Sequence, residues 1–123
     1  MATTNIVDKD GNSISASDAT VPSDRHFRGA WSLSGTTITE DLAVAKTIFK
    51  YKVREARGPL LDAEDVIYMK ALEADDADAK AASVAKKKAL RDAPAASAIS
   101  SADTIAKLKA AWDTSTLGDS PYA

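Results

Sequence analysis

The chain of 123 residues contains no cysteine and only one histidine, His26. Without cysteine it has no disulfide framework and no thiol nucleophile, and it cannot bind zinc through thiolates. One histidine on its own does not supply a zinc ligand set. The absence of cysteine leaves the compartment open, because such a chain is compatible with oxidising and reducing surroundings alike.

Motifs that bind phosphate or activate a serine are also missing. The five glycines are scattered and form no glycine-rich phosphate loop. No Gly-x-Ser-x-Gly sequence is present, and no Glu-x-x-His pattern occurs among the acidic residues. We therefore expect no cofactor, no metal and no enzymatic activity. His26 is interpreted as a loop or interface residue that is hydrogen-bonded locally.

No charge of one sign dominates, and no long apolar run is present. Sixteen Lys and Arg residues against eighteen Asp and Glu residues give a net charge of −2, which argues against nucleic acid or an anionic membrane as the partner. No apolar run approaches the roughly 20 residues that span a bilayer. The segment Met1–Asn5 lacks the basic and apolar regions of a signal peptide. We expect a soluble protein without a Sec signal.

Alanine is the most frequent of the hydrophobic residues. The hydrophobic fraction is 45%, but 25 of these residues are alanine, which leaves only 30 larger apolar side chains. Alanine has the highest helix propensity and buries little area. The composition therefore predicts a small helical protein that depends on a partner or on a second copy of itself. The run Lys86–Lys88 is interpreted as a solvated helix face.

The composition changes near residue 39. Residues 1–39 contain twelve serines and threonines, whereas residues 40–112 are rich in alanine, lysine, aspartate and leucine. We predict an extended N-terminal arm with short strands over residues 1–38, a helical domain over 39–112 and a C-terminal tail over 113–123. The predicted fold class is mainly α: a helical hairpin or bundle of three to four helices, with a β-hairpin in the arm.

The arm begins with a hairpin pattern. The segments Thr3–Val7 and Ser13–Ala16 flank Asp10-Gly11, a dipeptide typical of tight β-turns. The stretch Asp8–Asn12 also resembles the start of an EF-hand loop. The positions that would need the turn glycine and the bidentate glutamate hold a serine and an alanine, so we favour a polar turn over a calcium site.

Apolar spacing and capping residues predict four helices. Gly58-Pro59 is expected to separate the first helix from the second, and the second and third helices are expected to form an antiparallel hairpin. The expected N-terminal caps are Thr37-x-x-Glu40, Asp75-Asp76 and Ser100-x-x-Asp103. The predicted spans are Thr39 to Arg57, Pro59 to Ala74, Ala77 to Arg91 and Ser101 to Trp112.

The segment Asp24–Trp31 is the most informative for function. It contains two aromatic residues and two arginines, which is the composition of interface hot spots. We therefore predict partner contacts through Arg25, Phe27, Arg28 and Trp31. The alternative is that Phe27 and Trp31 cover the helical hairpin, and both interpretations can hold together.

A family resemblance extends over residues 20–112. Its longest element is VPSDRHFRGAW (Val21–Trp31), followed by KVREARGPLL (52–61), MKALEA (69–74), KALRD (88–92) and LKAAW (108–112). Together these segments resemble small proteins of tailed bacteriophages that are encoded near tail-fibre genes and described as tail-fibre assembly or tail-assembly chaperone-like proteins. The resemblance implies a role in the phage tail without catalysis.

The resemblance implies a partner and a place. The expected partner is a phage tail-fibre or baseplate protein, with a homo-oligomer as a further option, and the expected location is the virion tail or the host cytoplasm during assembly. A structural component stays in the finished particle, whereas an assembly chaperone does not. The alternative function is a phage head or neck protein, or another soluble adaptor unrelated to tail fibres.

Overall fold

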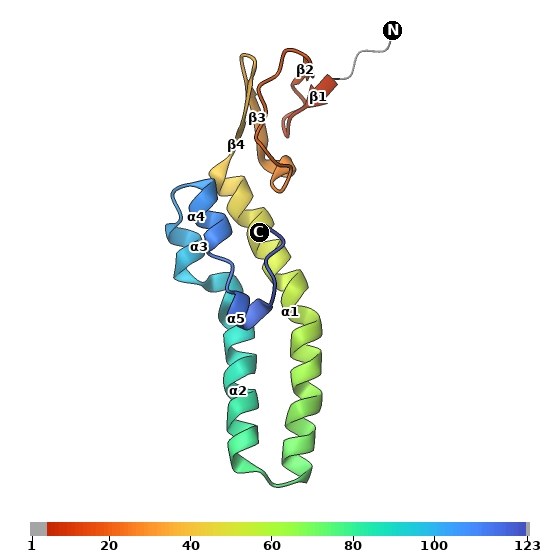
Figure 1. Ribbon diagram of the computed structural model, residues 1–123, viewed down its shortest axis with the longest axis vertical. Coiled ribbons are helices and arrows are strands. Elements are labelled where there is room, and N and C mark those ends of the chain that lie inside the picture. The colour runs from red at the N-terminus through yellow and green to blue at the C-terminus, as the bar shows by residue number, and fades with distance from the viewer. Residues whose placement is uncertain (1–4, 123) are drawn as a thin grey trace.

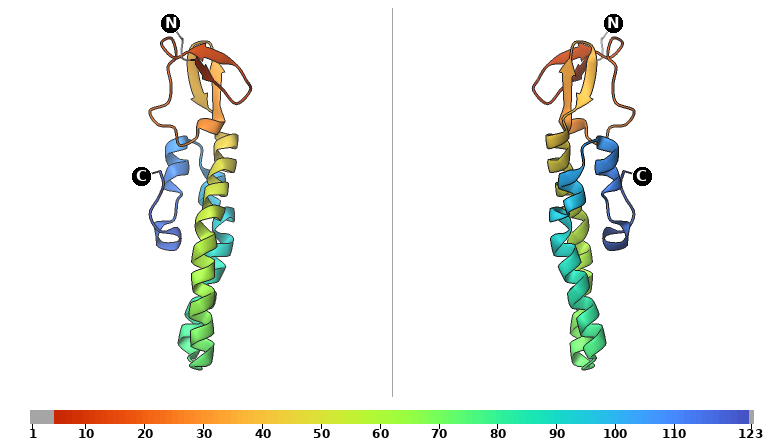
Figure 2. Two further views of the ribbon diagram at one scale, coloured as in Figure 1. Left: turned by 90° about the vertical axis from the view of Figure 1, so that its right-hand side faces the viewer. Right: turned by 90° about the vertical axis from the view of Figure 1, so that its left-hand side faces the viewer.

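The computed structural model describes residues 5–122 as an elongated, mainly α protein, as predicted (Figure 1). Two β-hairpins lie at one end and a long helical hairpin extends from the other (Figure 2). The expected bundle of three to four helices fits only loosely, because most of the helices after the hairpin are short. The helices are α1 (Leu42–Glu73), α2 (Ala77–Asp92), α3 (Ser97–Ser101), α4 (Ile105–Ala110) and α5 (Thr114–Leu117); the strands are β1 (Asn5–Val7), β2 (Ser13–Ser15), β3 (Trp31–Ser34) and β4 (Thr37–Glu40).

The first hairpin pairs β1 with β2 in antiparallel register, with Asn5 opposite Ser15. This confirms the predicted hairpin over its described part; Thr3 and Thr4 lie outside the described residues. The turn glycine, Gly11, has φ of +86°, a conformation that favours glycine. A two-stranded hairpin is marginal alone, so its attachment to the second hairpin matters.

The second hairpin pairs β3 with β4, with Trp31 opposite Glu40. The carboxylate of Asp8 joins the two hairpins, because Oδ2 accepts a hydrogen bond of 2.8 Å from the amide of Leu33. Its Oδ1 accepts from the amides of Asp10 and Asn12 at 3.0 and 2.8 Å. These donors lower the pKa of Asp8, with the Leu33 amide as the largest cause.

The helix α1 starts later than predicted. The predicted cap at Thr37-x-x-Glu40 is wrong, since these residues form β4. Asp41 caps α1 instead: its carboxylate accepts hydrogen bonds from the amides of Ala43 and Val44 at 3.1 and 3.4 Å. Pairing with β3 holds the Thr37 segment extended, and this pairing outweighs the local capping signal.

The predicted break at Gly58-Pro59 is also wrong, because α1 continues through Pro59. An interior proline removes the backbone hydrogen bond to the carbonyl four residues earlier, here Glu55, and typically costs about 3 kcal/mol. Both Glu55 and Pro59 are exposed, so water can reach this carbonyl. On another side of the helix, Arg57 donates a hydrogen bond of 2.8 Å to the carbonyl of Arg91, which ties this level of α1 to α2.

The expected antiparallel hairpin is formed by α1 and α2. Asp76 caps α2 by accepting a hydrogen bond of 3.0 Å from the amide of Ala79, as the sequence predicted. The helices are close at a small residue: the hydroxyl of Ser83, which is 1% exposed, donates to the carbonyl of Glu64 at 3.2 Å. Lys87 forms an ion pair with Asp65 one turn away.

The predicted fourth helix is divided in two. Residues of α3 and α4 flank an extended Ala102, and the cap of α4 is Thr104, not the predicted Ser100-x-x-Asp103 pair. The segment expected to be a tail forms α5, which Asp113 caps. This C-terminal segment packs against the core, since Leu117 and Tyr122 are only 7% and 9% exposed.

The core lies where the arm, α1 and the C-terminal segment meet. Phe27 from the arm and Phe49 from α1 are both completely buried there. The ring of Tyr122 stacks between them, with centroid distances of 5.0 and 5.4 Å. The buried cluster comprises Phe27, Ala30, Ala45, Phe49, Val53, Leu90, Ile99, Ala102, Leu108, Trp112, Leu117 and Tyr122. Among the described residues, α1 beyond Val53 adds none of these buried side chains, although the partly buried Leu61 packs against them.

Candidate functional site: surfaces for protein interaction

The four residues predicted to bind a partner lie in one short stretch, but they point in different directions. Phe27 and Trp31 are 0% and 2% exposed, so both rings are covered by the chain itself. Arg25 and Arg28 are exposed, and the Arg28 guanidinium lies 5.1 Å from the centroid of the Trp31 ring. The alternative interpretation, in which the aromatic residues cover the helices, describes Phe27, which packs in the core with α1. The two arginines remain available at the surface.

His26 lies within this stretch, between Arg25 and Phe27, and its side chain belongs to a group of charged residues. Asp24 forms an ion pair with Lys109 of α4, and its Oδ1 lies 3.5 Å from Nδ1 of His26. The hydrogen bond from Lys109 is the largest cause of the lowered pKa of Asp24. The ring of His26 also packs edge-on against Tyr122. The geometry is that of a histidine held by its neighbours at the junction of the arm and the helices.

Glu40 completes this junction. One of its carboxylate oxygens, Oε2, is buried and accepts no hydrogen bond from any residue that the structure describes. Burial raises the pKa of Glu40, and the nearby charge of Asp24 raises it further. Across residues 5–122, no cluster of three or more His, Asp or Glu side chains has an arrangement that could hold a metal ion.

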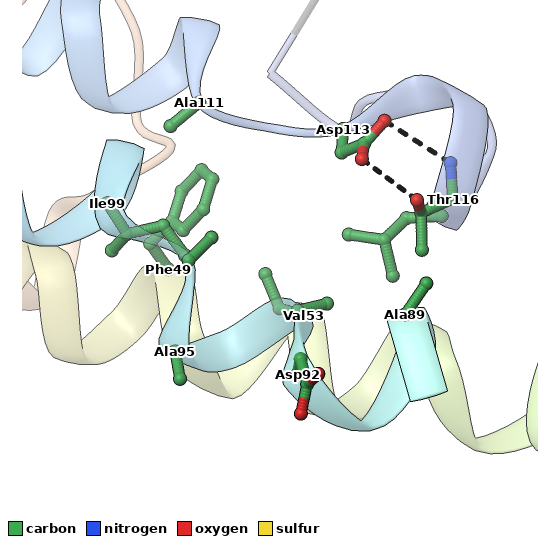
Figure 3. A pocket seen from close by; sticks show the side chains of 12 residues that line it. Phe49, Val53, Ala89, Asp92, Ala95, Ile99, Ala111, Asp113 and Thr116 are labelled. Atoms are coloured by element: carbon green, nitrogen blue, oxygen red, sulfur yellow. Dashed lines mark hydrogen bonds between the residues drawn. The ribbon is translucent and has the colours of Figure 1, made fainter. Parts of the chain in front are cut away.

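A pocket of about 420 Å³ lies between α1, α2 and the C-terminal segment (Figure 3). Apolar side chains form most of it, among them Phe49, Val53 and Leu117. Asp92 and Asp113 supply the carboxylates of the lining. The carboxylate of Asp113 accepts hydrogen bonds from the hydroxyls of Ser115 and Thr116 at 2.6 and 2.8 Å. These bonds lower the pKa of Asp113 and turn its oxygens toward α5. The Thr116 hydroxyl is paired with the Asp113 carboxylate, but the lowered pKa makes this carboxylate a weak base.

The distal half of the helical hairpin exposes large apolar side chains. Leu60 and Ile67 have the seven-residue spacing of one apolar helix face, yet they are 36% and 47% exposed. α2 packs along this part of α1, and the residues buried there include the small Ala71 and Ser83. The exposed set is Leu60, Val66, Ile67, Met69, Leu72 and Val84, each between 36% and 54% exposed.

A second pocket, of about 300 Å³, is cationic. Lys50, Arg54 and Arg57 of α1 line it together with Arg91 at the end of α2. Cations in the last turn of a helix complement its dipole, which would explain this group if α1 ended near residue 57. Because α1 continues to Glu73, that explanation fails. The i, i+4, i+7 spacing of the three α1 cations was the available signal that they share one face.

Comparison with known proteins returned no match: no family model, curated protein or solved structure is significantly similar to this chain. In the part of the chain that the structure describes, no helix has the length and apolar character needed to cross a membrane.

Proposed function

We propose that this chain is a non-enzymatic bacteriophage tail protein that binds the tail fibre or the baseplate. It acts either as a structural or adaptor component of the virion or as a fibre-assembly chaperone. The assignment to phage tails rests on the resemblance of residues 20–112, above all the segment Val21–Trp31. In this proposal residues 1–38 are an arm attached to a small helical bundle.

The observation that best supports a binding role is the apolar surface of the projecting hairpin. Val66 and Met69 are each 54% exposed on α1, and Val84 is 50% exposed on α2. Single exposed apolar residues are ordinary, but a group of them on one projecting element is typical of a protein-interaction surface. The hairpin extends beyond the rest of the fold (Figure 1), so a partner can reach it without unfolding the core.

The experiment is co-expression with the candidate tail-fibre and baseplate proteins, followed by co-purification. The variant Val66→Asp/Met69→Asp should reduce recovery of the partner at least about tenfold, because a charge in a desolvated contact costs far more than a lost methyl group. The control is Ala85→Asp, an exposed position on α2 that adds charge without removing a large apolar side chain. Circular dichroism must show equal helix content in all three proteins.

Mass spectrometry of purified particles separates the two versions of the proposal. A fixed copy number per particle identifies a structural component, whereas presence in the infected cell and absence from particles identifies a chaperone. Association with head or neck proteins, with none for fibre or baseplate proteins, would favour the alternative adaptor function. Equal partner recovery for Val66→Asp/Met69→Asp and the parent would exclude the hairpin as the contact surface.

A further inference from the structure

The cationic pocket is the strongest site that the proposed function leaves unused. Its side chains come from three successive turns of α1 and from the end of α2, and Pro94 and Ala95 complete its wall. Lys50 and Arg57 are half-buried, while Arg54 and Arg91 are exposed. Four positive groups thus surround one volume of about 300 Å³, which has no acidic residue in its lining.

These cations have no acidic partner in the described part of the chain. Among residues 5–122, none of Lys50, Arg54, Arg57 and Arg91 forms an ion pair. The nearest acidic residues in the sequence are used elsewhere: Glu55 pairs with Lys52, and Asp92 pairs with Lys88. Like charges gathered without counter-charge repel one another, so an anion that enters the pocket relieves this repulsion.

Arg57 is held in place for such a contact. One of its terminal nitrogens donates to the carbonyls of Arg91 and Leu90 at 2.8 and 3.4 Å. A guanidinium has five N–H donors, so others remain for a ligand. Because the side chain is already ordered by these bonds, less conformational entropy is lost when it binds a carboxylate.

We propose that this pocket binds a short acidic segment of a partner protein through carboxylate–guanidinium contacts. This inference rests on the proposed function only in requiring a protein partner. A long polyanion fits less well, because the exposed carboxylate of Asp62 further along α1 would repel it. The chain's own acidic tip is partly occupied: Asp75 pairs with Lys80, and Asp76 caps α2. We assign the occupant to another protein, and the test below distinguishes it from a second copy.

The probe is a short fluorescein-labelled peptide rich in glutamate, with the glutamine version of the same peptide as the uncharged reference. Fluorescence anisotropy with the full chain measures the affinity at low and at near-physiological salt. The double variant Arg54→Glu/Arg91→Glu should bind the acidic peptide at least about tenfold more weakly, since it replaces two attractive contacts with repulsive ones. Salt should weaken binding to the parent protein.

The matched control is Lys70→Glu/Lys86→Glu. It makes the same change in net charge with one substitution on each helix, at exposed positions outside the pocket. The control should retain the parent affinity within about twofold, the scatter expected for distant surface charges. An equal loss of affinity in both double variants would show that only net charge matters and would overturn the proposal.

Two further results would also overturn it. The first is displacement of the peptide by a single-stranded oligonucleotide or by inorganic phosphate at lower concentration than by unlabelled peptide. The second is a dimer in sedimentation equilibrium that Arg54→Glu/Arg91→Glu dissociates, because the occupant would then be a second copy. The two proposals can fail separately. Val66 and Met69 lie outside the pocket, so a failure of this chain to bind tail proteins does not decide whether the pocket binds the acidic peptide.

Discussion

The ring of Tyr122 stacks on the ring of Phe27, with their centroids 5.0 Å apart and their planes inclined by 16°. The contact joins residues near opposite ends of the chain. On its other side Tyr122 stacks on Phe49 at the same inclination, with centroids 5.4 Å apart. The C-terminal segment therefore fastens the arm to α1. Stability should depend on this small aromatic cluster more than on the long hairpin.

Tyr122 makes stability sensitive to alkaline pH. Burial raises its pKa from 10.0 to about 12, and its hydroxyl has no hydrogen-bond partner among residues 5–122. The folded state thus favours the neutral phenol: the stabilisation is complete below pH 10 and is lost as the pH rises from 10 through 12. The loss of stability over this pH range should be at most about 3 kcal/mol. Chemical denaturation at several alkaline pH values should show this loss of stability. Tyr122→Phe should remove most of this pH dependence.

The continuity of α1 can be tested at Gly58. Inside a helix Gly58→Ala should stabilise the protein by about 0.5–1 kcal/mol, because alanine loses less backbone entropy than glycine. A β-carbon built at Gly58 meets no atom within 4 Å, so no clash opposes the gain. Pro59→Ala should add up to about 3 kcal/mol by restoring the hydrogen bond to Glu55. Urea denaturation measures both effects. If the chain instead turned at Gly58, both substitutions would destabilise it.

Trp31 and Leu108 should contribute similar amounts to the free energy of unfolding. They are 2% and 0% exposed. Trp31→Ala should cost about 3–5 kcal/mol and Leu108→Ala about 2–5 kcal/mol of unfolding free energy. Arg28→Ala, which removes only an exposed contact over the Trp31 ring, should cost less than about 1 kcal/mol. Thermal and chemical denaturation of the three variants gives the order. A melting temperature unchanged by Trp31→Ala would contradict the burial of that ring.

Calcium should leave the melting temperature unchanged. Both carboxylate oxygens of Asp8 already accept hydrogen bonds, Oδ1 from the Asp10 and Asn12 amides and Oδ2 from the Leu33 amide. Binding an ion would require breaking these bonds. Asp8→Ala should lower the stability equally with calcium and with a chelator. A calcium-dependent rise in melting temperature that Asp8→Ala abolishes would establish the EF-hand-like interpretation.

The sequence by itself determined the features that depend on neighbouring residues. The alanine-rich composition predicts a mainly α fold, Asp10-Gly11 predicts the turn between β1 and β2, and Asp76 predicts the start of α2. Each of these follows from a local preference: helix propensity, the positive φ of a glycine, or a carboxylate that caps free amides. No distant contact is needed to express them.

Only the tertiary structure decided where distant residues meet. The local signal at Pro59 predicts a break in the helix. α1 nevertheless continues, because α2 packs along it and water can hydrogen-bond to the Glu55 carbonyl that Pro59 leaves unpaired. Tyr122 is buried because Phe27 and Phe49 lie on either side of it, and no periodicity in the C-terminal segment indicates this. The cationic pocket likewise requires Arg91 to lie beside the arginines of α1. A sequence pattern records preferences within a few residues, whereas these features depend on packing between elements far apart in the chain.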